Sequence, residues 1–425
     1  MLRSNRPPAA VAAVIALVAA ACSPGPPSGG DALTIGAVYP VSGKQGPGGT
    51  EEVAGARLAV ELANDRGGVH GRPVRLDVVD VGAGEAAPSA IENLRRRGID
   101  LVLGSYGSTI SAPAAVAANR RGMLLWETGA VGEIAPEAGA GESFFRLAPM
   151  GASLGRAAVA FVRDQLTPLL GVPAEPMRYA VAYVDDAYGR SVGLGAADEV
   201  ESSGQVLAGA FPYDLRGFDA RGLARSIAET RPDVLFVSAY LEDGVALRTA
   251  TVDEGLALRA SVGTSSSYCM PSFAARLGRA AVGLFASDKP DAHQVAQVRP
   301  GTLAPGAREA LAWASTRYRQ RHGEDMTPAA LSGFANTWAL VGHVLPAAGP
   351  GAGAAAVAAA ARRLKLGPGT LPNGAGLDLS GPGVLDAGEN RAAVSVIWQW
   401  VDDRTQAVVW PPAFATRPLQ AIPIL

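Results

Sequence analysis

The sequence predicts an α/β fold made of two similar units in tandem, each with a parallel sheet covered by helices. Short apolar runs alternate with stretches of helical length from residue 33 to about residue 264, which is typical of parallel sheets with helices on both faces. The pattern restarts near residue 178. With 425 residues, 48% hydrophobic and 18% charged, the chain is long enough for two or three globular domains.

The first unit opens with an apolar run at residues 33–38 (LTIGAV), which predicts a strand. The glycine-rich segment 43–49 predicts a loop, and residues 51–65 predict a helix. Apolar residues recur there at intervals of three and four, as on one face of a helix. The remaining predicted elements are a strand at 74–80, a helix at about 86–97, a strand at 99–104, a helix at 111–121 and a strand at 123–127.

The second unit begins with the run RYAVAYV at residue 178 and repeats the alternation. Its predicted elements are a strand at 178–184, a helix at 188–203, a strand at 205–211, a helix at 219–230, a strand at 233–239, a helix at 242–255 and a short strand at 260–264. Helices are predicted further on, at 306–322, 328–345 and 352–366, and the tail (RAAVSVIWQWVDD to AVVW) predicts paired strands. Each unit is about the size of a flavodoxin-like sheet, so two lobes with a cleft between them are expected.

Charge and motif content exclude several classes of function. The formal net charge of −2 gives no reason to expect a nucleic-acid partner. The chain has two cysteines and four scattered histidines, so the sequence shows no disulfide framework and no zinc-type spacing. The segment GAGAAA at 351–356 resembles a dinucleotide-binding fingerprint only superficially, because it follows no predicted strand. We therefore expect no enzyme, no cofactor and no metal.

The N-terminus predicts an export signal. Arg3 and Arg6 precede the 13-residue apolar run 9–21, which is too short for a mature membrane span. The small residues before Cys22 resemble the lipobox of a bacterial lipoprotein signal, in which the cysteine becomes the lipidated first residue. Residues 1–21 are then the signal and 22–32 a flexible tether. The alternative is a secretory signal cut nearby, with Cys22 incidental.

The segment LVLGSYGSTISAPAA, residues 101–115, carries the first candidate site. A buried strand stops at Gly104, and small hydroxyl and glycine residues lead into a helix. Ligands of open α/β sheets bind outside the carboxyl ends of strands, and a helix start favours an anion. Ser108 and Thr109 are thus candidates to hold a carboxylate. The alternative is that Ser105, Ser108 and Thr109 only cap the helix.

Several segments resemble the leucine/isoleucine/valine-binding family, the type I solute-binding proteins of ABC importers. They are VYPVSG, ELANDRGGVHG, LVLGSYGSTISAPAA, YVDDAYG and DVLFVSAY, in family order and spacing over the first 290 residues. The resemblance implies two flavodoxin-like α/β lobes with parallel sheets, joined by a three-crossing hinge, with the ligand between them. The division it implies is 33–148 with 288–378 for lobe I, and 149–287 with 379–425 for lobe II.

The resemblance also implies site residues. The family's carboxylate-binding serine falls on Ser108, beside Thr109. A backbone position on the next loop falls on Gly129, next to Ala130. The remaining positions that match family site residues are Tyr188, Tyr240 and Ser265, the last where the family has an acid that pairs with the ligand's ammonium.

Three positions depart from the family pattern. Val131 stands where the family has a threonine, Ser265 lacks a carboxylate, and Gly48 stands near the family's aromatic lid. A buried ammonium without a carboxylate partner is costly, so either another acid substitutes or the ligand has no ammonium. Three acids at predicted strand ends could pair with a ligand ammonium instead: Glu127, Glu242 and Asp243. The alternative is that they are simply solvated. Tyr106 and Trp126 could form an aromatic wall of the site, or they could pack in the core.

The resemblance predicts a lipoprotein on the outer, periplasmic face of the cell membrane. It captures a small ligand, an amino acid or related carboxylate, and delivers it to an ABC permease. A monomer anchored by lipid on Cys22 is expected. The alternative is a ligand-sensing receptor subunit of a signalling system with the same fold.

Overall fold

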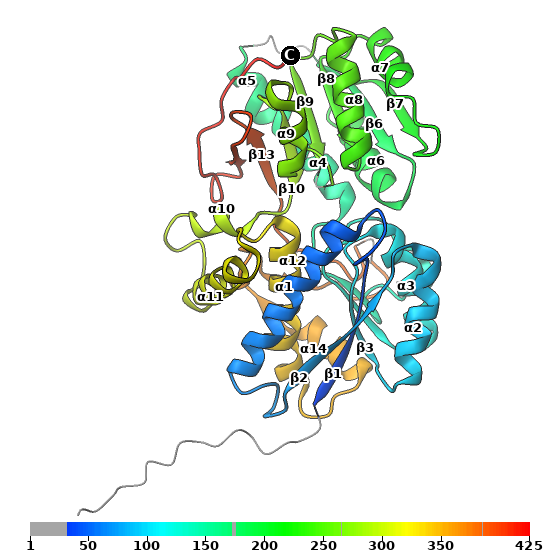
Figure 1. Cartoon of the computed structure of the whole chain (residues 1–425), viewed down its shortest axis with the longest axis vertical. Helices are drawn as coiled ribbons and strands as arrows, with labels where there is room; N and C mark the ends of the chain where they lie inside the picture. Colours follow the sequence, from blue (N-terminus) through cyan, green and yellow to red (C-terminus); the bar gives the residue numbers. More distant parts are fainter. Residues whose placement is uncertain (1–31, 172–175, 265, 385) are drawn as a thin grey trace, which may run out of the picture.

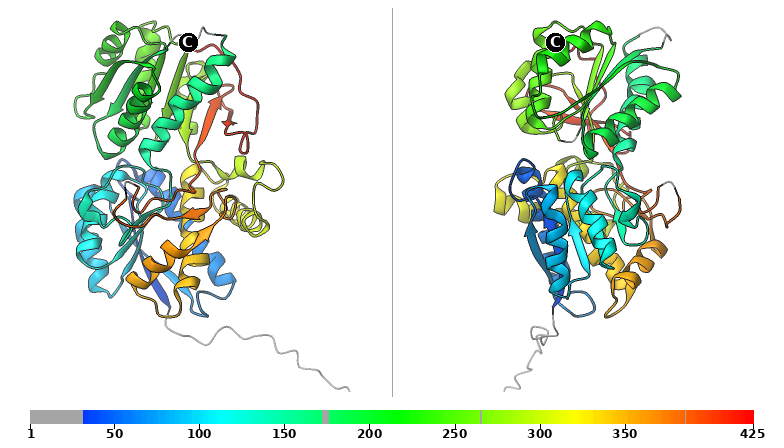
Figure 2. Two further views of the ribbon diagram at one scale, coloured as in Figure 1. Left: turned by 180° about the vertical axis from the view of Figure 1, so that it is seen from behind. Right: turned by 90° about the vertical axis from the view of Figure 1, so that its right-hand side faces the viewer.

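The computed structural model describes residues 32–171, 176–264, 266–384 and 386–425. Figure 1 shows two lobes stacked along the long axis, each with a central sheet flanked by helices. Figure 2 shows the same two lobes from behind and from the side. No helix within the described residues is long and apolar enough to cross a membrane.

The first lobe contains a five-stranded parallel sheet in the order β2-β1-β3-β4-β5. Both faces of this sheet are buried, because alternate side chains of β1 join different cores: Ile35 and Tyr39 lie in one cluster and Val38 in another. The elements are β1 (Leu33–Tyr39), α1 (Gly46–Asp65), β2 (Val74–Asp80), α2 (Ala87–Arg96), β3 (Leu101–Gly104), α3 (Ser108–Arg120), β4 (Leu124–Glu127) and β5 (Phe144–Arg146).

The second lobe contains a seven-stranded sheet in the order β14-β13-β10-β9-β8-β6-β7. Its strands from β6 to β10 are parallel, and the β13–β14 hairpin joins the free edge of β10 in antiparallel fashion. The elements are α4 (Gly151–Phe161), β6 (Arg178–Val184), α6 (Ala187–Ser202), β7 (Val206–Tyr213), α7 (Ala220–Glu229), β8 (Val234–Ser238), α8 (Leu241–Asp253), β9 (Ala260–Thr264), α9 (Pro271–Leu277), β10 (Phe285–Asp288), β13 (Val396–Trp400) and β14 (Gln406–Trp410). The predicted two-unit α/β fold is confirmed.

A third set of elements follows β10 and covers the first lobe. It comprises α10 (Ala292–Ala296), α11 (Pro305–His322), α12 (Pro328–Trp338), α13 (Leu345–Ala348), α14 (Ala354–Arg363) and the short pair β11 (Lys365–Leu366) and β12 (Leu377–Asp378). The helix predicted at 328–345 is interrupted by a π-helical stretch, Ala339–Val344. Within the described residues the chain therefore passes between the lobes after β5, after β10 and before β13.

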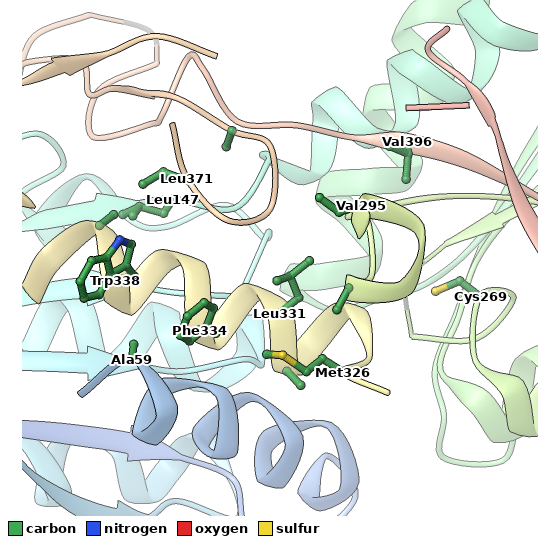
Figure 3. Close-up of a cluster of buried hydrophobic side chains, with 14 of the residues drawn as sticks. Ala59, Leu147, Cys269, Val295, Met326, Leu331, Phe334, Trp338, Leu371 and Val396 are labelled. Atoms are coloured by element: carbon green, nitrogen blue, oxygen red, sulfur yellow. The ribbon is translucent and has the colours of Figure 1, made fainter. Parts of the chain in front are cut away.

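Helix α12 is the main partner of α1 in the first lobe. Figure 3 shows Leu331, Phe334 and Trp338 of α12 in one apolar cluster, with Ala59 of α1 facing them. The two helices approach closely at Gly55, where a Cβ atom would lie 1.9 Å from the Ala330 carbonyl oxygen. Segments about 275 residues apart in the sequence thus build one lobe.

The last passage between the lobes lies further along the chain than the predicted boundary at residues 378 and 379. Leu379 pairs with Asn390, and Glu389 lies beside Arg146 of β5. The Arg146 Nη1 atom is 3.0 Å from Glu389 Oε1 in a nearly buried ion pair. Residues up to Asn390 therefore contact the first lobe before the chain enters β13.

Candidate functional site

The carboxyl ends of the parallel strands of both lobes face the junction between the lobes (Figure 1). The start of α3 lies next to the start of α6 there: a Cβ atom on Gly132 would be 2.6 Å from Ser108 Cβ and 2.5 Å from the Ala187 carbonyl oxygen. Gly132 N donates to Ser108 Oγ over 2.9 Å. Ligands of open α/β sheets bind at such strand ends, so this junction is the candidate site.

The corner between β3 and α3 does not use its hydroxyls as helix caps. The N-cap of α3 is Gly107, which makes no side-chain capping bond. Ser108 Oγ accepts from Gly132 N, and Thr109 Oγ1 accepts from Gln45 Nε2 over 3.1 Å. The Ser105 hydroxyl donates to Glu127. These hydroxyls therefore tie the corner to two neighbouring loops rather than to the helix end.

Glu127, at the end of β4, organises the loops of the first lobe. Its fully buried carboxylate accepts hydrogen bonds from both the backbone and the hydroxyl of Ser105, and from the Ser111 hydroxyl. The backbone N–H groups of Gly129 and Ala130 also donate to it, at 2.9 and 2.8 Å. With five donors on two oxygens, Glu127 binds the protein's own loops, whereas the sequence made it a candidate partner for a ligand ammonium.

Tyr106 occupies the space beside Gly48. A Cβ atom at Gly48 would lie 2.1 Å from Tyr106 Cζ, so the tyrosine ring stands where a side chain at position 48 would otherwise be. Tyr106 has a left-handed backbone, with φ of 70°, which is uncommon for a residue other than glycine. Burial raises the pKa of the Tyr106 hydroxyl, and Glu51, Glu52, Tyr188 and Asp288 raise it further. The ring therefore lies near charged and polar groups of both lobes.

Trp126 belongs to the core and does not form the aromatic wall considered from the sequence. Its side chain is fully buried, its Nε1 donates to the Asn336 carbonyl over 2.9 Å, and its ring centroid lies 6.1 Å from that of Phe145. Trp126 therefore packs in the core, which was the alternative to a role in the site.

The second lobe contributes two tyrosines that lie together. The rings of Tyr188 and Tyr240 have centroids 5.4 Å apart. The Tyr188 hydroxyl is 2.5 Å from Thr264 Oγ1, and the Tyr240 hydroxyl donates to Asp186 Oδ2 over 2.8 Å. Asp186 also caps α6 by accepting from the backbone N–H groups of Tyr188 and Gly189. The pair is thus fixed to the start of α6.

The two acids considered on α8 are already engaged. Glu242 is exposed and forms a two-pronged ion pair with Arg276, at 2.6 and 3.0 Å. Asp243 is buried and accepts from the Tyr213 hydroxyl over 2.6 Å and from Tyr240 N over 3.2 Å. Ser265 and Cys22 lie outside the described residues.

Three charged residues that the sequence analysis did not single out lie at the junction. Glu52 of α1 is fully buried and accepts from the Thr128 hydroxyl over 2.6 Å and from the backbone of Tyr106. Asp288 ends β10, is 1% exposed, and accepts from Cys269 Sγ over 3.0 Å. Lys289 follows it, is 8% exposed, and donates from Nζ to the Gly129 carbonyl over 3.1 Å.

The buried acids of this group have raised pKa values. Burial raises the pKa of Glu52 to about 8, although the positive charge of Lys289 opposes the shift. Burial likewise raises the pKa of Asp288, again against Lys289. The sequence could have pointed to Glu52, because this acid lies on the same face of the predicted helix as the apolar residues Ala56 and Ala63. It could have pointed to Lys289 because lysine is rare in this chain, with only Lys44 and Lys365 besides.

Comparison with known proteins places this architecture in a family. A model of the family described as periplasmic binding protein matches residues 32–398. The Leu/Ile/Val-binding protein homolog 8 of Brucella abortus is 26% identical over 258 residues, which is 60% of this chain. The matched part is 64% of that relative, so the chain spans less than two thirds of its length.

Two solved structures share the fold at low identity. LivJ of Streptococcus pneumoniae, in complex with isoleucine, is 17% identical with a TM-score of 0.68, over 90% of this chain and 100% of that chain. A solute-binding protein from R. palustris, in complex with benzoate, is 16% identical with a TM-score of 0.69, over 92% and 99% of the two chains. With the family match over most of its length, this chain belongs to the type I periplasmic binding proteins, the family of the leucine/isoleucine/valine-binding proteins.

Proposed function

We propose that this protein is an extracytoplasmic solute-binding protein that holds a small carboxylate ligand between its lobes and delivers it to an ABC importer. The observation that carries the proposal is the meeting of the two lobes at Ser108, Gly132 and Ala187. The starts of α3 and α6 face each other there, with polar side chains of both lobes around them. A ligand at this junction contacts both lobes at once.

The start of α3 is suited to the negative end of the ligand. Ser108 accepts a hydrogen bond from Gly132 N through its oxygen, which leaves its own O–H to donate to a carboxylate. The backbone N–H groups and the dipole of the first helical turn add to this attraction. Thr109 and the loop at Gly129 and Ala130, which Glu127 holds through its N–H groups, complete the first-lobe side of the proposed site.

The second lobe supplies the surface that closes over the ligand. Tyr188 and Tyr240 present aromatic rings that are held by hydrogen bonds of their hydroxyls, and Tyr106 faces them from the first lobe. A ligand that contacts both lobes favours the closed arrangement by its differential affinity for it. Aromatic surfaces around a polar anchor suit a ligand with an apolar body.

The relatives define the range of ligands to test. The Brucella relative is named for leucine, isoleucine and valine, one structural neighbour holds isoleucine, and another holds benzoate. We infer that the ligand of this protein is an amino acid or a related small carboxylate. Lipid anchoring at Cys22, delivery to a permease in the cell membrane and the monomeric state belong to the same proposal.

The proposed site is tested with ligand-induced stabilisation. The purified protein is screened by thermal shift against amino acids and organic acids; a ligand at 100 times its Kd adds about 2.7 kcal/mol to the free energy of unfolding. We expect Ser108→Ala to remove most of that stabilisation for a carboxylate ligand, whereas Ser226→Ala, on the exposed face of α7, leaves it unchanged. Stabilisation that persists in Ser108→Ala contradicts the assignment of this corner, and a complete absence of binding contradicts the function.

A further inference from the structure

Lys289 places a positive charge at the junction of the lobes. It lies on the passage that leaves β10 of the second lobe, and its ammonium reaches across to the Gly129 carbonyl of the first. The side chain is 8% exposed. An ammonium group has three N–H donors, and the single hydrogen bond described for Lys289 uses one of them. A buried cation with donors to spare points to an acceptor on a ligand.

Lys289 and Ser108 act on the same short loop. Lys289 donates to the carbonyl of Gly129, and Ser108 accepts from the N–H of Gly132, three residues further on. Lys289 lies on the passage between the lobes and Ser108 at the start of α3 in the first lobe, and both side chains converge on one stretch of backbone. They therefore bring a cation and a hydroxyl donor to one region, which suits the oxygens of an anionic group.

The acids nearby are poorly placed to receive an ammonium from a ligand. Glu127 is occupied by five internal donors. Glu52 is fully buried and has one oxygen without a hydrogen-bond partner among the described residues, but burial raises its pKa to about 8, so the charged form that would pair with an ammonium is disfavoured. Asp288 has one oxygen without a hydrogen-bond partner among the described residues, but Lys289 directly follows it. A ligand ammonium at Asp288 would lie close to the like charge of Lys289.

We propose that Lys289 takes the place of a ligand ammonium in this site, so that the preferred ligand is a carboxylate without an α-amino group. This inference rests on the proposed function, because it assigns the chemical class of the ligand in the same inter-lobe site. Lys289 is then the residue that determines specificity: it donates to an oxygen of the ligand while it remains bonded to Gly129. A carboxylate without an amino group pairs with the buried ammonium of Lys289. The amino acid with the same side chain would place a second positive charge beside it.

Matched ligand pairs test this inference by isothermal titration calorimetry with the whole protein. The pairs are leucine and 4-methylpentanoate, phenylalanine and 3-phenylpropanoate, and glutamate and glutarate, each differing only in the α-amino group. We expect the amine-free acid of a pair to bind about 10- to 100-fold more tightly, as for a charge-assisted hydrogen bond made or lost. Lys289→Met, which keeps the length of the side chain without its charge, reduces this preference at least about tenfold.

Lys289→Arg keeps the charge and is expected to keep the preference for the amine-free acid. Circular dichroism and cooperative thermal unfolding verify that both variants are folded. A loss of preference confined to Lys289→Met supports the inference, because a purely structural role would lower the affinity for both members of a pair alike.

The outcomes separate this inference from the proposed function. An amino acid that binds as tightly as, or more tightly than, its amine-free partner overturns the inference and leaves the proposed function intact. An unchanged preference in Lys289→Met also overturns it. If no member of any pair binds the folded wild-type protein, both the inference and the proposed carboxylate-binding function are contradicted.

Discussion

The two lobes prepare their sides of the junction in different ways. In the first lobe, one buried carboxylate, Glu127, gathers five hydrogen bonds from two loops and a helix. In the second lobe the hydrogen bonds are divided among several groups: Tyr188 bonds to Thr264, and Asp186 and Asp243 both bond to Tyr240. The first surface depends on a single residue, whereas the second distributes its hydrogen bonds over several. This difference teaches that the ligand binds to a first-lobe surface that is already formed. It also implies that single substitutions lower the stability of the protein less in the second lobe than at Glu127.

The most damaging change is expected at Glu127. Glu127→Ala leaves buried donors of Ser105, Ser111, Gly129 and Ala130 without their acceptor, so the free energy of unfolding is expected to fall by roughly 3–5 kcal/mol. Urea unfolding followed by circular dichroism measures the change. Glu242→Ala, which removes an exposed partner of Arg276 in the second lobe, serves as the matched control and is expected to change little. Equal losses in the two variants would erase the contrast between the lobes.

A large pH effect is expected from Glu52. Its pKa is raised from 4.5 to about 8 by burial in the folded protein, so between these values the folded state binds a proton that the unfolded state has released. The contribution of Glu52 to stability therefore decreases as pH rises from about 4.5 to 8, by at most about 1.4 kcal/mol per unit.

Glu52→Gln resembles the protonated form and removes this dependence. We expect the variant and the wild type to have similar stability near pH 5, and the variant to be the more stable above pH 8. Unfolding free energies measured at several pH values between 5 and 9 provide the test. Parallel curves for the two proteins would show that Glu52 does not titrate in this range.

A small effect is expected at Tyr188. Tyr188→Phe keeps the ring against Tyr240 but removes the hydroxyl bonded to Thr264, so the free energy of unfolding is expected to fall by about 1 kcal/mol. The same unfolding assay measures it. A loss as large as that of Glu127→Ala would mean that the second lobe also depends on a single group.

The order of strands and helices could be predicted because each element is marked locally, the buried strands by short apolar runs and the helices by their length and spacing. Residues 178–184 form such a run and 187–202 are of helical length, and the structure has the expected strand and helix there. β5 was missed since Phe144–Arg146 is too short for any period. The interruption of the helix at Ala339–Val344 also has no local signal of that kind. Local pattern thus accounts for most of the fold.

The candidate site could be predicted only in part, because its chemistry depends on neighbours that the fold brings together. The resemblance identified Ser108, Tyr188 and Tyr240, and the structure brings them to the lobe junction. Glu127 looked like a ligand contact because it ends a strand; its role became visible only with Gly129 and Ala130 turned toward it. No element was predicted at Phe285–Asp288, so Lys289, which follows it, was passed over.

The pairing of the β13–β14 hairpin with β10 has a consequence for biogenesis. These strands are synthesised after all the others of their sheet, and they cover an edge whose neighbour β10 is made more than 100 residues earlier. Until the hairpin arrives, the β10 edge exposes unpaired backbone groups to any neighbouring chain. A nascent chain or a fragment that lacks the hairpin is therefore open to aggregation, and this sheet cannot mature before the hairpin has been translated.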